Sequence, residues 1–114
     1  MAIAGEVMPN IEHRLADIRA EWSRRGYGFE YWIDPPGQTW RDFVHDVDEV
    51  VILVEGEIEI ALEGKTLRPC VGEEVLIPAH ARHTVTNTGE TSNRWCFGYK
   101  GETDGQRRQA DQKR

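Results

Sequence analysis

Near the start of the chain, apolar residues recur every three or four positions, which is the spacing of one helix face. These positions are Ile11, Leu15, Ile18 and Trp22. Asn10 before them is a residue type that caps helix N-termini, and Gly26 after them is one that ends helices. We therefore predict an amphipathic helix over roughly residues 10–25, whose single apolar stripe packs on the domain as a lid.

From Tyr27 onward the pattern changes to a period of two, which is typical of strands with one buried face. In the clearest segment, Ile58, Ile60 and Leu62 alternate with Glu57, Glu59 and Ala61. Glycine and proline turns separate the segments. Strands are predicted at 27–33, 40–45, 49–54, 57–62, 65–68, 74–77, 82–88 and 94–99. Seven or eight short strands of this kind predict an all-β sandwich or small barrel.

The chain of 114 residues is long enough for one domain with one core. We expect a leader and helix at 1–26, a barrel at 27–100 and a disordered tail at 101–114. The tail contains no apolar residue larger than Ala110, so it offers little surface to bury.

The composition is that of an ordinary globular protein, with 39% hydrophobic and 30% charged residues. Acidic residues outnumber basic ones by 20 to 14, which gives a formal net charge of −6. This balance argues against nucleic acid or an anionic membrane surface as a partner, because both require a basic face. It is compatible with a site for a cation.

The longest aliphatic run, Val50–Val54, is far shorter than the ~20 apolar residues that span a bilayer. The first residues show neither a basic leader nor a hydrophobic stretch, so we recognise no secretory signal. Cys70 and Cys96 are therefore expected to be reduced and structural, and the protein to be cytoplasmic.

Three of the four histidines, His45, His80 and His83, lie in the strand region, and the carboxylates Asp48 and Glu49 follow the first of them. Imidazole nitrogens and carboxylate oxygens are the ligand types that hold first-row transition metals. A single histidine is more often a surface residue than a ligand, so the spacing between these residues carries the argument. Adjacent strand residues face opposite sides, which separates Asp48 from Glu49.

The spacing resembles two motifs of the cupin family, over roughly residues 31–99. The second motif reads Gly, five residues, Pro, one residue, Gly, two residues, His, three residues, Asn. Gly72, Pro78, His83 and Asn87 stand at its positions, and His80 replaces the second glycine.

The first motif of the family pairs two histidines with a glutamate and ends in a glycine. Glu49 stands seven residues before Gly56, and His45 stands four before Glu49, where the second histidine belongs. Phe43 occupies the position of the first histidine. Gly37 leads into the motif.

The resemblance implies a small cupin jelly-roll barrel with one N-terminal amphipathic helix. It also implies that His45, Glu49 and His83 converge on one divalent transition metal, with Fe, Zn, Mn and Ni not distinguished. Two histidines and a carboxylate form the facial set known from non-haem Fe(II), and three protein ligands with solvent also suit catalytic Zn²⁺. Because Phe43 removes one ligand of the usual family set, weak metal binding or none is the alternative.

Phe43 and His80 are the residues we assign to the pocket beside the metal. Phe43 shares a strand face with His45 and would form an apolar wall. His80 has three interpretations: a substitute fourth ligand, a base in the pocket, or an exposed turn residue, which we favour. Further aromatic candidates for the interior, mostly interpreted as plain core, are Trp32, Trp40, Trp95, Phe97 and Tyr99. Asn87 is expected to anchor a turn.

The leading functional hypothesis is a metal-dependent oxygenase of the dioxygenase type that acts on a small organic molecule. A metal-dependent isomerase, epimerase-like enzyme or lyase is equally compatible with the ligand set. The alternatives without catalysis are a module that binds or senses a metal or small ligand, and a structural cupin that has lost its site. The resemblance also implies a homodimer, with the helix and residues 27–33 as the natural interface.

Overall fold

The computed structural model describes residues 10–102. The predicted leader at 1–9 and the predicted disorder from 103 onward lie outside these residues. The described part contains helix α2 and eight strands. Their bounds are α2 Asn10–Arg24, β1 Glu30–Asp34, β2 Thr39–Phe43, β3 Glu49–Glu55, β4 Glu59–Leu62, β5 Lys65–Leu67, β6 Glu74–Ile77, β7 His83–Thr86 and β8 Asn93–Tyr99.

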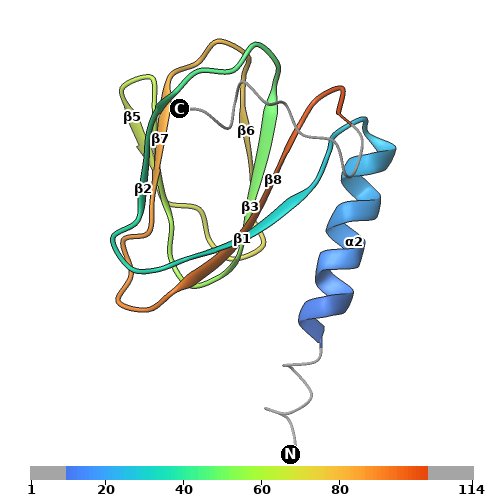
Figure 1. The fold of residues 1–114 in the computed structure, drawn as a ribbon, viewed down its shortest axis with the longest axis horizontal. Helices are drawn as coiled ribbons and strands as arrows, with labels where there is room; N and C mark the ends of the chain where they lie inside the picture. The colour runs from blue at the N-terminus through green and yellow to red at the C-terminus, as the bar shows by residue number, and fades with distance from the viewer. Residues whose placement is uncertain (1–9, 103–114) are drawn as a thin grey trace, which may run out of the picture.

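The strands form two four-stranded antiparallel sheets that face each other (Figure 1). One sheet has the order β1-β8-β3-β6 and the other β2-β7-β4-β5. Consecutive strands alternate between the sheets at several points, so the chain wraps around a common interior. The predicted all-β jelly-roll barrel with one N-terminal helix is confirmed.

Between its two terminal glutamates, strand β3 is aliphatic at every position from Val50 to Val54, because both of its faces are covered. Val51 and Leu53 point into the barrel, whereas Val50 and Val54 pack on the side of the helix. Strand β4 alternates instead, with Ile60 fully buried and its neighbour Ala61 exposed, because no helix among residues 10–102 covers its outer face. The difference in sequence pattern between the two strands therefore reports which sheet lies under the helix.

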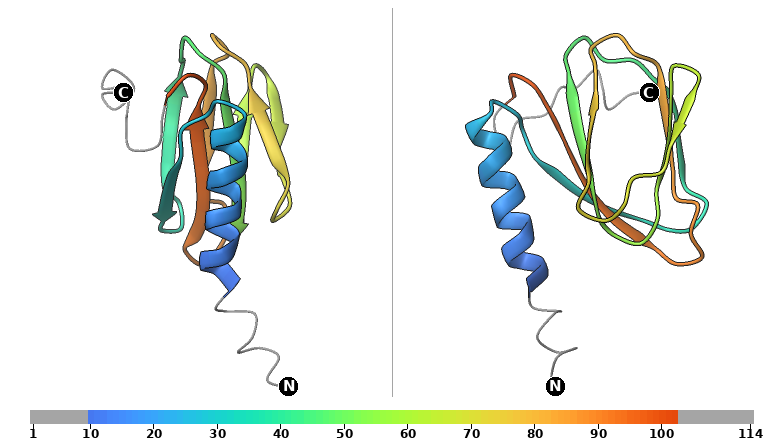
Figure 2. Two further views of the ribbon diagram at one scale, coloured as in Figure 1. Left: turned by 90° about the vertical axis from the view of Figure 1, so that its right-hand side faces the viewer. Right: turned by 180° about the vertical axis from the view of Figure 1, so that it is seen from behind.

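Helix α2 lies along the outer face of the β1-β8-β3-β6 sheet (Figures 1 and 2). The predicted apolar stripe is the contact face: Trp22 is 1% exposed, and Ile11, Leu15 and Ile18 pack against the same cluster. Arg14 adds a polar contact, since its Nη2 donates to the carbonyl oxygen of Val54 at 3.0 Å. The predicted position of the helix as a lid on the domain is confirmed.

The C-terminal turn of α2 is fastened to strand β6 through Glu74. Its Oε1 accepts a hydrogen bond from Trp22 Nε1 at 3.0 Å, and its Oε2 pairs with Arg25 Nη2 at 2.6 Å. The hydrogen bond from Arg25 is the main cause that lowers the pKa of Glu74 below its ordinary value of 4.5; burial opposes it. Glu74 thus links the helix to the edge of the sheet.

Glu74→Gln should lower the free energy of unfolding by about 1 kcal/mol at neutral pH, the contribution of one partly exposed charged pair. A carboxylate whose pKa is lower in the folded state stabilises the fold above its ordinary pKa. The difference between variant and wild type should therefore shrink as the pH falls below 4.5. Urea unfolding at a series of pH values measures it. Glu90→Gln, on an exposed loop residue, is the matched control. A difference that stays constant with pH would contradict the assignment.

Several strand boundaries differ from the predicted ones. Strand β1 begins at Glu30 rather than at Tyr27, which makes only an isolated bridge to Lys100. Strand β2 ends at Phe43, so the prediction that it continues to His45 is wrong. The pairing of β2 with β7 shifts register between Trp40 and Phe43, and the chain leaves the sheet directly afterwards. No local sequence pattern signals such a bulge.

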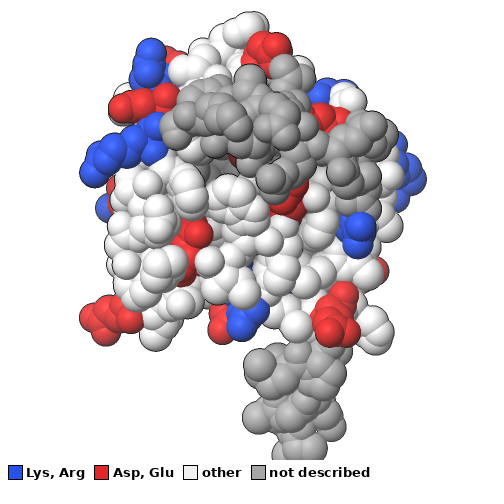
Figure 3. Space-filling view, in the orientation of Figure 1, with Lys and Arg blue, Asp and Glu red and all other residues white. Residues whose placement is uncertain are grey.

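On the part of the surface that Figure 3 colours by residue type, most charged side chains lie toward the outline. No helix among residues 10–102 is both long and apolar enough to cross a lipid bilayer.

Candidate metal centre

The three predicted metal ligands, His45, Glu49 and His83, meet inside the barrel. One ligand atom from each lies within 4.8 Å of the others, and all three residues are buried. Glu49 Oε1 is 3.2 Å from His83 Nε2 and 3.4 Å from His45 Nε2. A nitrogen and an oxygen ligand of one zinc ion lie at most about 4.2 Å apart, which is the sum of the two bond lengths. Both oxygen–nitrogen separations are therefore compatible with a shared ion.

Two of these residues are placed by strand pairing. Glu49 opens β3 and lies opposite Tyr99 of β8, while His83 opens β7 and lies opposite Phe43 of β2. The first pair belongs to one sheet and the second to the facing sheet. Side chains that point inward from the two pairs therefore meet across the barrel.

His45 reaches the cluster from the loop between β2 and β3. Its carbonyl oxygen accepts a hydrogen bond from the backbone N–H of His80 at 2.7 Å. Asp48 Oδ1 accepts one from the backbone N–H of Ala79 at 2.8 Å. These bonds tie the loop to the turn before β7, which sets the position of the imidazole. Asp48 is engaged at this turn, in agreement with the prediction that Glu49 is the residue facing the site.

The tautomer of His83 follows from its second ring nitrogen. His83 Nδ1 lies 2.9 Å from the carbonyl oxygen of Ala81. A carbonyl oxygen can only accept, so Nδ1 carries a proton, and in the neutral imidazole Nε2 presents its lone pair on the side of Glu49. A histidine that ligates a metal usually makes this kind of bond through its other nitrogen.

The donor set fits a metal ion. Glu49 Oε1 is buried and accepts no hydrogen bond from any residue that the structure describes. Burying a carboxylate without a compensating donor is costly, and a cation offsets that cost. Two imidazole nitrogens face the same oxygen, and this combination of nitrogen and oxygen donors suits Fe, Zn and similar divalent ions.

Phe43 lies beside both histidines, although His45 follows β2 in a loop and does not share a strand face with Phe43 as predicted. Its ring centroid is 5.8 Å from that of His45 and 6.1 Å from that of His83. The phenyl ring thus occupies the side of the site where the family motif has a further histidine, and it offers no ligand atom. The structure gives this side an apolar wall.

His80 is exposed and adopts a positive φ of 70°. Its backbone N–H, rather than its imidazole, makes the contact with His45 described above. The exposed position accords with the favoured interpretation as a turn residue. A role for its side chain in the pocket stays a prediction.

Tyr99 brings a hydroxyl group to the site that the sequence did not mark as polar chemistry. Tyr99 Oη lies 3.4 Å from His45 Nε2, and the two rings are in edge contact with centroids 4.7 Å apart. Alternation along 94–99 indicated only that Tyr99 faces inward with Trp95 and Phe97. The register opposite Glu49, which places the hydroxyl at the site, appears only in the fold.

Asp34 is a second buried carboxylate that sequence reasoning missed. It is 5% exposed, and its Oδ2 accepts hydrogen bonds from Trp40 Nε1 at 2.9 Å and Trp95 Nε1 at 3.0 Å. Trp40 belongs to β2 and Trp95 to β8, so one carboxylate joins the two sheets. The neighbouring prolines indicated a turn, and no spacing rule connects positions 34, 40 and 95.

Other predicted roles near the site are structural. Asn87 anchors a turn, as predicted: its Nδ2 donates to the carbonyl oxygens of Asp34 and Thr91, and its Oδ1 accepts from Gly89 N–H. Cys70 is exposed and Cys96 buried, and both are free thiols. Burial raises the pKa of Cys96 to about 12, which leaves it unreactive.

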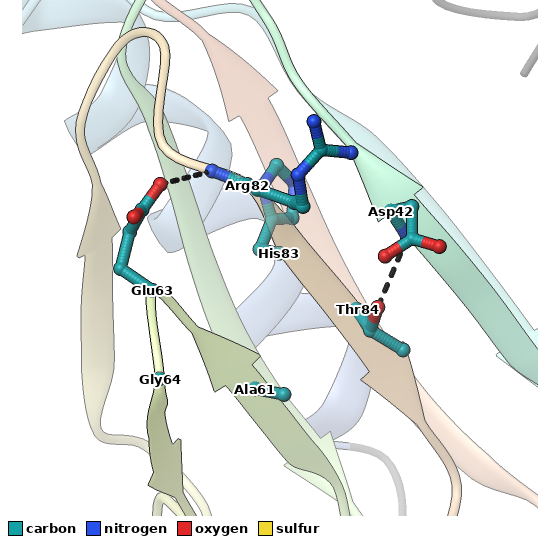
Figure 4. A pocket seen from close by; sticks show the side chains of 7 residues that line it. All are labelled: Asp42, Ala61, Glu63, Gly64, Arg82, His83 and Thr84. Atoms are coloured by element: carbon teal, nitrogen blue, oxygen red, sulfur yellow. Dashed lines mark hydrogen bonds between the residues drawn. The ribbon is translucent and has the colours of Figure 1, made fainter.

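A separate hollow lies next to the cluster (Figure 4). Its lining residues are Asp42, Ala61, Glu63, Gly64, Arg82, His83 and Thr84. Glu63 Oε2 accepts a hydrogen bond from Arg82 N–H, and Thr84 Oγ1 accepts one from Asp42 N–H. The hollow shares His83 with the metal centre, but the imidazole is 1% exposed and contacts Glu49 instead.

The sequence matches the family model of the Cupin domain over residues 30–99. This match covers more than half of the chain, and it coincides with the two sheets and the histidine–glutamate cluster. The chain belongs to the cupin family.

Solved structures with this fold come from several bacteria. A protein of unknown function from Streptococcus pyogenes has a TM-score of 0.60 and 18% identity, over 65% of this chain and 63% of its own. A cupin 2 domain-containing protein from Halorhodospira halophila has a TM-score of 0.58 and 24% identity, over 65% of this chain and 51% of its own. A salicylate 1,2-dioxygenase from Pseudaminobacter salicylatoxidans has a TM-score of 0.60 and 22% identity, over 63% of this chain and 21% of its own.

The chain therefore spans less than two thirds of the length of each of these proteins. At such identities the likeness shows a shared fold. No curated protein matched the sequence.

Proposed function

We propose that this cupin holds one divalent transition metal with His45, Glu49 and His83 and is an oxygenase for a small organic molecule. The observation that carries the proposal is the buried carboxylate oxygen Glu49 Oε1, which faces two imidazole nitrogens at 3.2 and 3.4 Å. A carboxylate buried for structural reasons alone would normally be given hydrogen-bond donors, as Asp34 is by two tryptophans.

The protein supplies three ligands, so a bound ion retains open positions at which oxygen or an organic ligand can coordinate. The residues around the cluster orient the ligand side chains and exclude water from the site. Ala81 fixes the ring of His83 through its carbonyl oxygen. Phe43 covers one side with an apolar ring in contact with both histidines, and this excludes water from that side.

The choice of oxygenase among metal-dependent reactions draws on two considerations. Two histidines with one carboxylate are the ligand set of non-haem Fe(II) oxygenases. The salicylate 1,2-dioxygenase described above contains a region of the same fold. Isomerase or lyase chemistry uses the same metal as a Lewis acid, and a binding module uses it without turnover.

Oxygen consumption tests the proposal. Protein loaded anaerobically with Fe(II) should consume oxygen with at least one member of a panel of small phenols, thiols and diketones. His45→Ala should abolish this consumption, because the variant lacks one of the three ligands. Bound iron without turnover on any panel member would favour the binding module. Product formation without oxygen uptake would favour an isomerase or lyase.

Two expectations from the sequence stay predictions. The first is the homodimer expected for a small cupin, and sedimentation of the full chain measures the oligomeric state. The cytoplasmic location is the other.

A further inference from the structure

We infer that the hydroxyl of Tyr99 is a positioning group that hydrogen-bonds to an anionic ligand on the metal, an inference that rests on the proposed function. The ligand class is a small anion, or the anionic group of an organic molecule. The sequence motifs give Tyr99 no such role, and its place follows from the sheet register.

The inward positions at this end of the barrel form two pairs. Glu49 and Tyr99 are partners on β3 and β8, and His83 and Phe43 are partners on β7 and β2. Each pair combines one metal ligand with one aromatic side chain that does not ligate. The two aromatics differ in chemistry, because the ring of Tyr99 carries a hydroxyl and that of Phe43 does not. The surroundings of the site are thus polar on one side and apolar on the other.

The hydroxyl lies within reach of the metal position. Tyr99 Oη is 3.4 Å from His45 Nε2, and Glu49 Oε1 is also 3.4 Å from that nitrogen. His45 Nε2 therefore has the hydroxyl and the carboxylate oxygen as neighbours at equal distance. Once this nitrogen ligates a metal, its lone pair is used and it can neither donate nor accept a hydrogen bond. The hydroxyl can then donate to a further ligand on the ion.

This arrangement selects ligands by charge. Tyr99 is 6% exposed, so a hydrogen bond from its hydroxyl is made in a site of low dielectric constant. A donor in such a place stabilises an anionic acceptor more than a neutral one. Phe43 provides apolar contact but no donor. An anion with an apolar body can direct its charged end to the hydroxyl of Tyr99 and its apolar part to the ring of Phe43.

The test uses cobalt-loaded protein, whose visible absorption reports ligands that bind to the metal. Wild type and Tyr99→Phe are titrated with azide and acetate as anionic probes, and with imidazole as a neutral one. Metal-bound imidazole offers no lone pair to a phenol, so it measures access to the ion alone. Tyr31→Phe is the matched control, since Tyr31 Oη accepts its bond from Arg94 Nη1 at 2.6 Å, away from the cluster.

The expected result is that Tyr99→Phe keeps its cobalt content and its imidazole affinity. Its Kd for azide and acetate should rise about tenfold, the effect of losing one hydrogen bond to a charged group. Tyr31→Phe should match wild type throughout. Unchanged anion affinities in Tyr99→Phe would overturn the inference, and so would anion and imidazole affinities that fall together, which indicates a structural role. Failure of wild type to bind cobalt would overturn the proposed function itself.

Discussion

Glu49→Gln should reduce the metal content of the purified protein from about one ion per chain to nearly none. The substitution keeps the size of the side chain and removes the charge that faces two imidazole nitrogens. Even groups that only orient a metal ligand affect affinity by about 10–100-fold, and loss of the carboxylate ligand should exceed that. Elemental analysis after metal reconstitution measures the change.

The matched control is Glu55→Gln, on the exposed end of the same strand, where Glu55 pairs with Arg94. It should keep the metal content of wild type. Without metal, Glu49→Gln should be at least as stable as wild type, because a buried carboxylate oxygen that accepts no hydrogen bond, here Oε1, costs free energy. Equal metal content in Glu49→Gln and wild type would remove the ligand assignment. A large loss of stability in the metal-free variant would indicate a structural carboxylate.

Gly98→Ala should lower the free energy of unfolding by about 3 kcal/mol or more. A Cβ atom at Gly98 would overlap the carbonyl oxygen of Gly28 and come within 2.8 Å of the carbonyl carbon. It would also approach Trp22 Cε3 to 3.2 Å. The obstacle is mainly backbone, so a change of rotamer cannot relieve it. The segment before β1 would have to move away from β8, and this movement would disturb the packing of α2 on the sheet.

Chemical denaturation measures the effect, and Gly89→Ala is the matched control. A Cβ atom at Gly89 would meet Asn87 Oδ1 and Glu57 Cβ at 3.4 Å, an ordinary contact distance. This control should lie within about 1 kcal/mol of wild type. If the two variants were equally stable, the close approach of Gly28 to β8 would not exist in solution.

The periodicity of the sequence was sufficient for most of the fold. Positions that recur at helical spacing became the contact face of α2, and the alternation in 57–62 identified the inward residues of β4. These patterns are reliable because a helix and a strand each present one face at a fixed period. Ends of strands were less predictable: His45 lies outside β2, since the bulge between Trp40 and Phe43 depends on pairing with β7.

The residues of the metal centre were also predicted only in part from the sequence. The spacing of His45, Glu49 and His83 matched the family motifs, and the structure brings these three residues together. The hydroxyl of Tyr99 and the carboxylate of Asp34 were not assigned roles, although both are buried and polar. Their contacts join residues 54 and 61 positions apart in the chain, which a motif of local spacing does not contain.

By itself, the sequence determined the fold class, the amphipathic helix, and the residue types and spacing of the candidate ligands. These properties depend on local periodicity and on short motifs, so they can be read along the chain. Only the tertiary structure decided which sheet the helix covers, which tautomer His83 adopts and what stands opposite Glu49. Such facts depend on strand order and register, and those are set by the joint burial of side chains from both sheets and the helix.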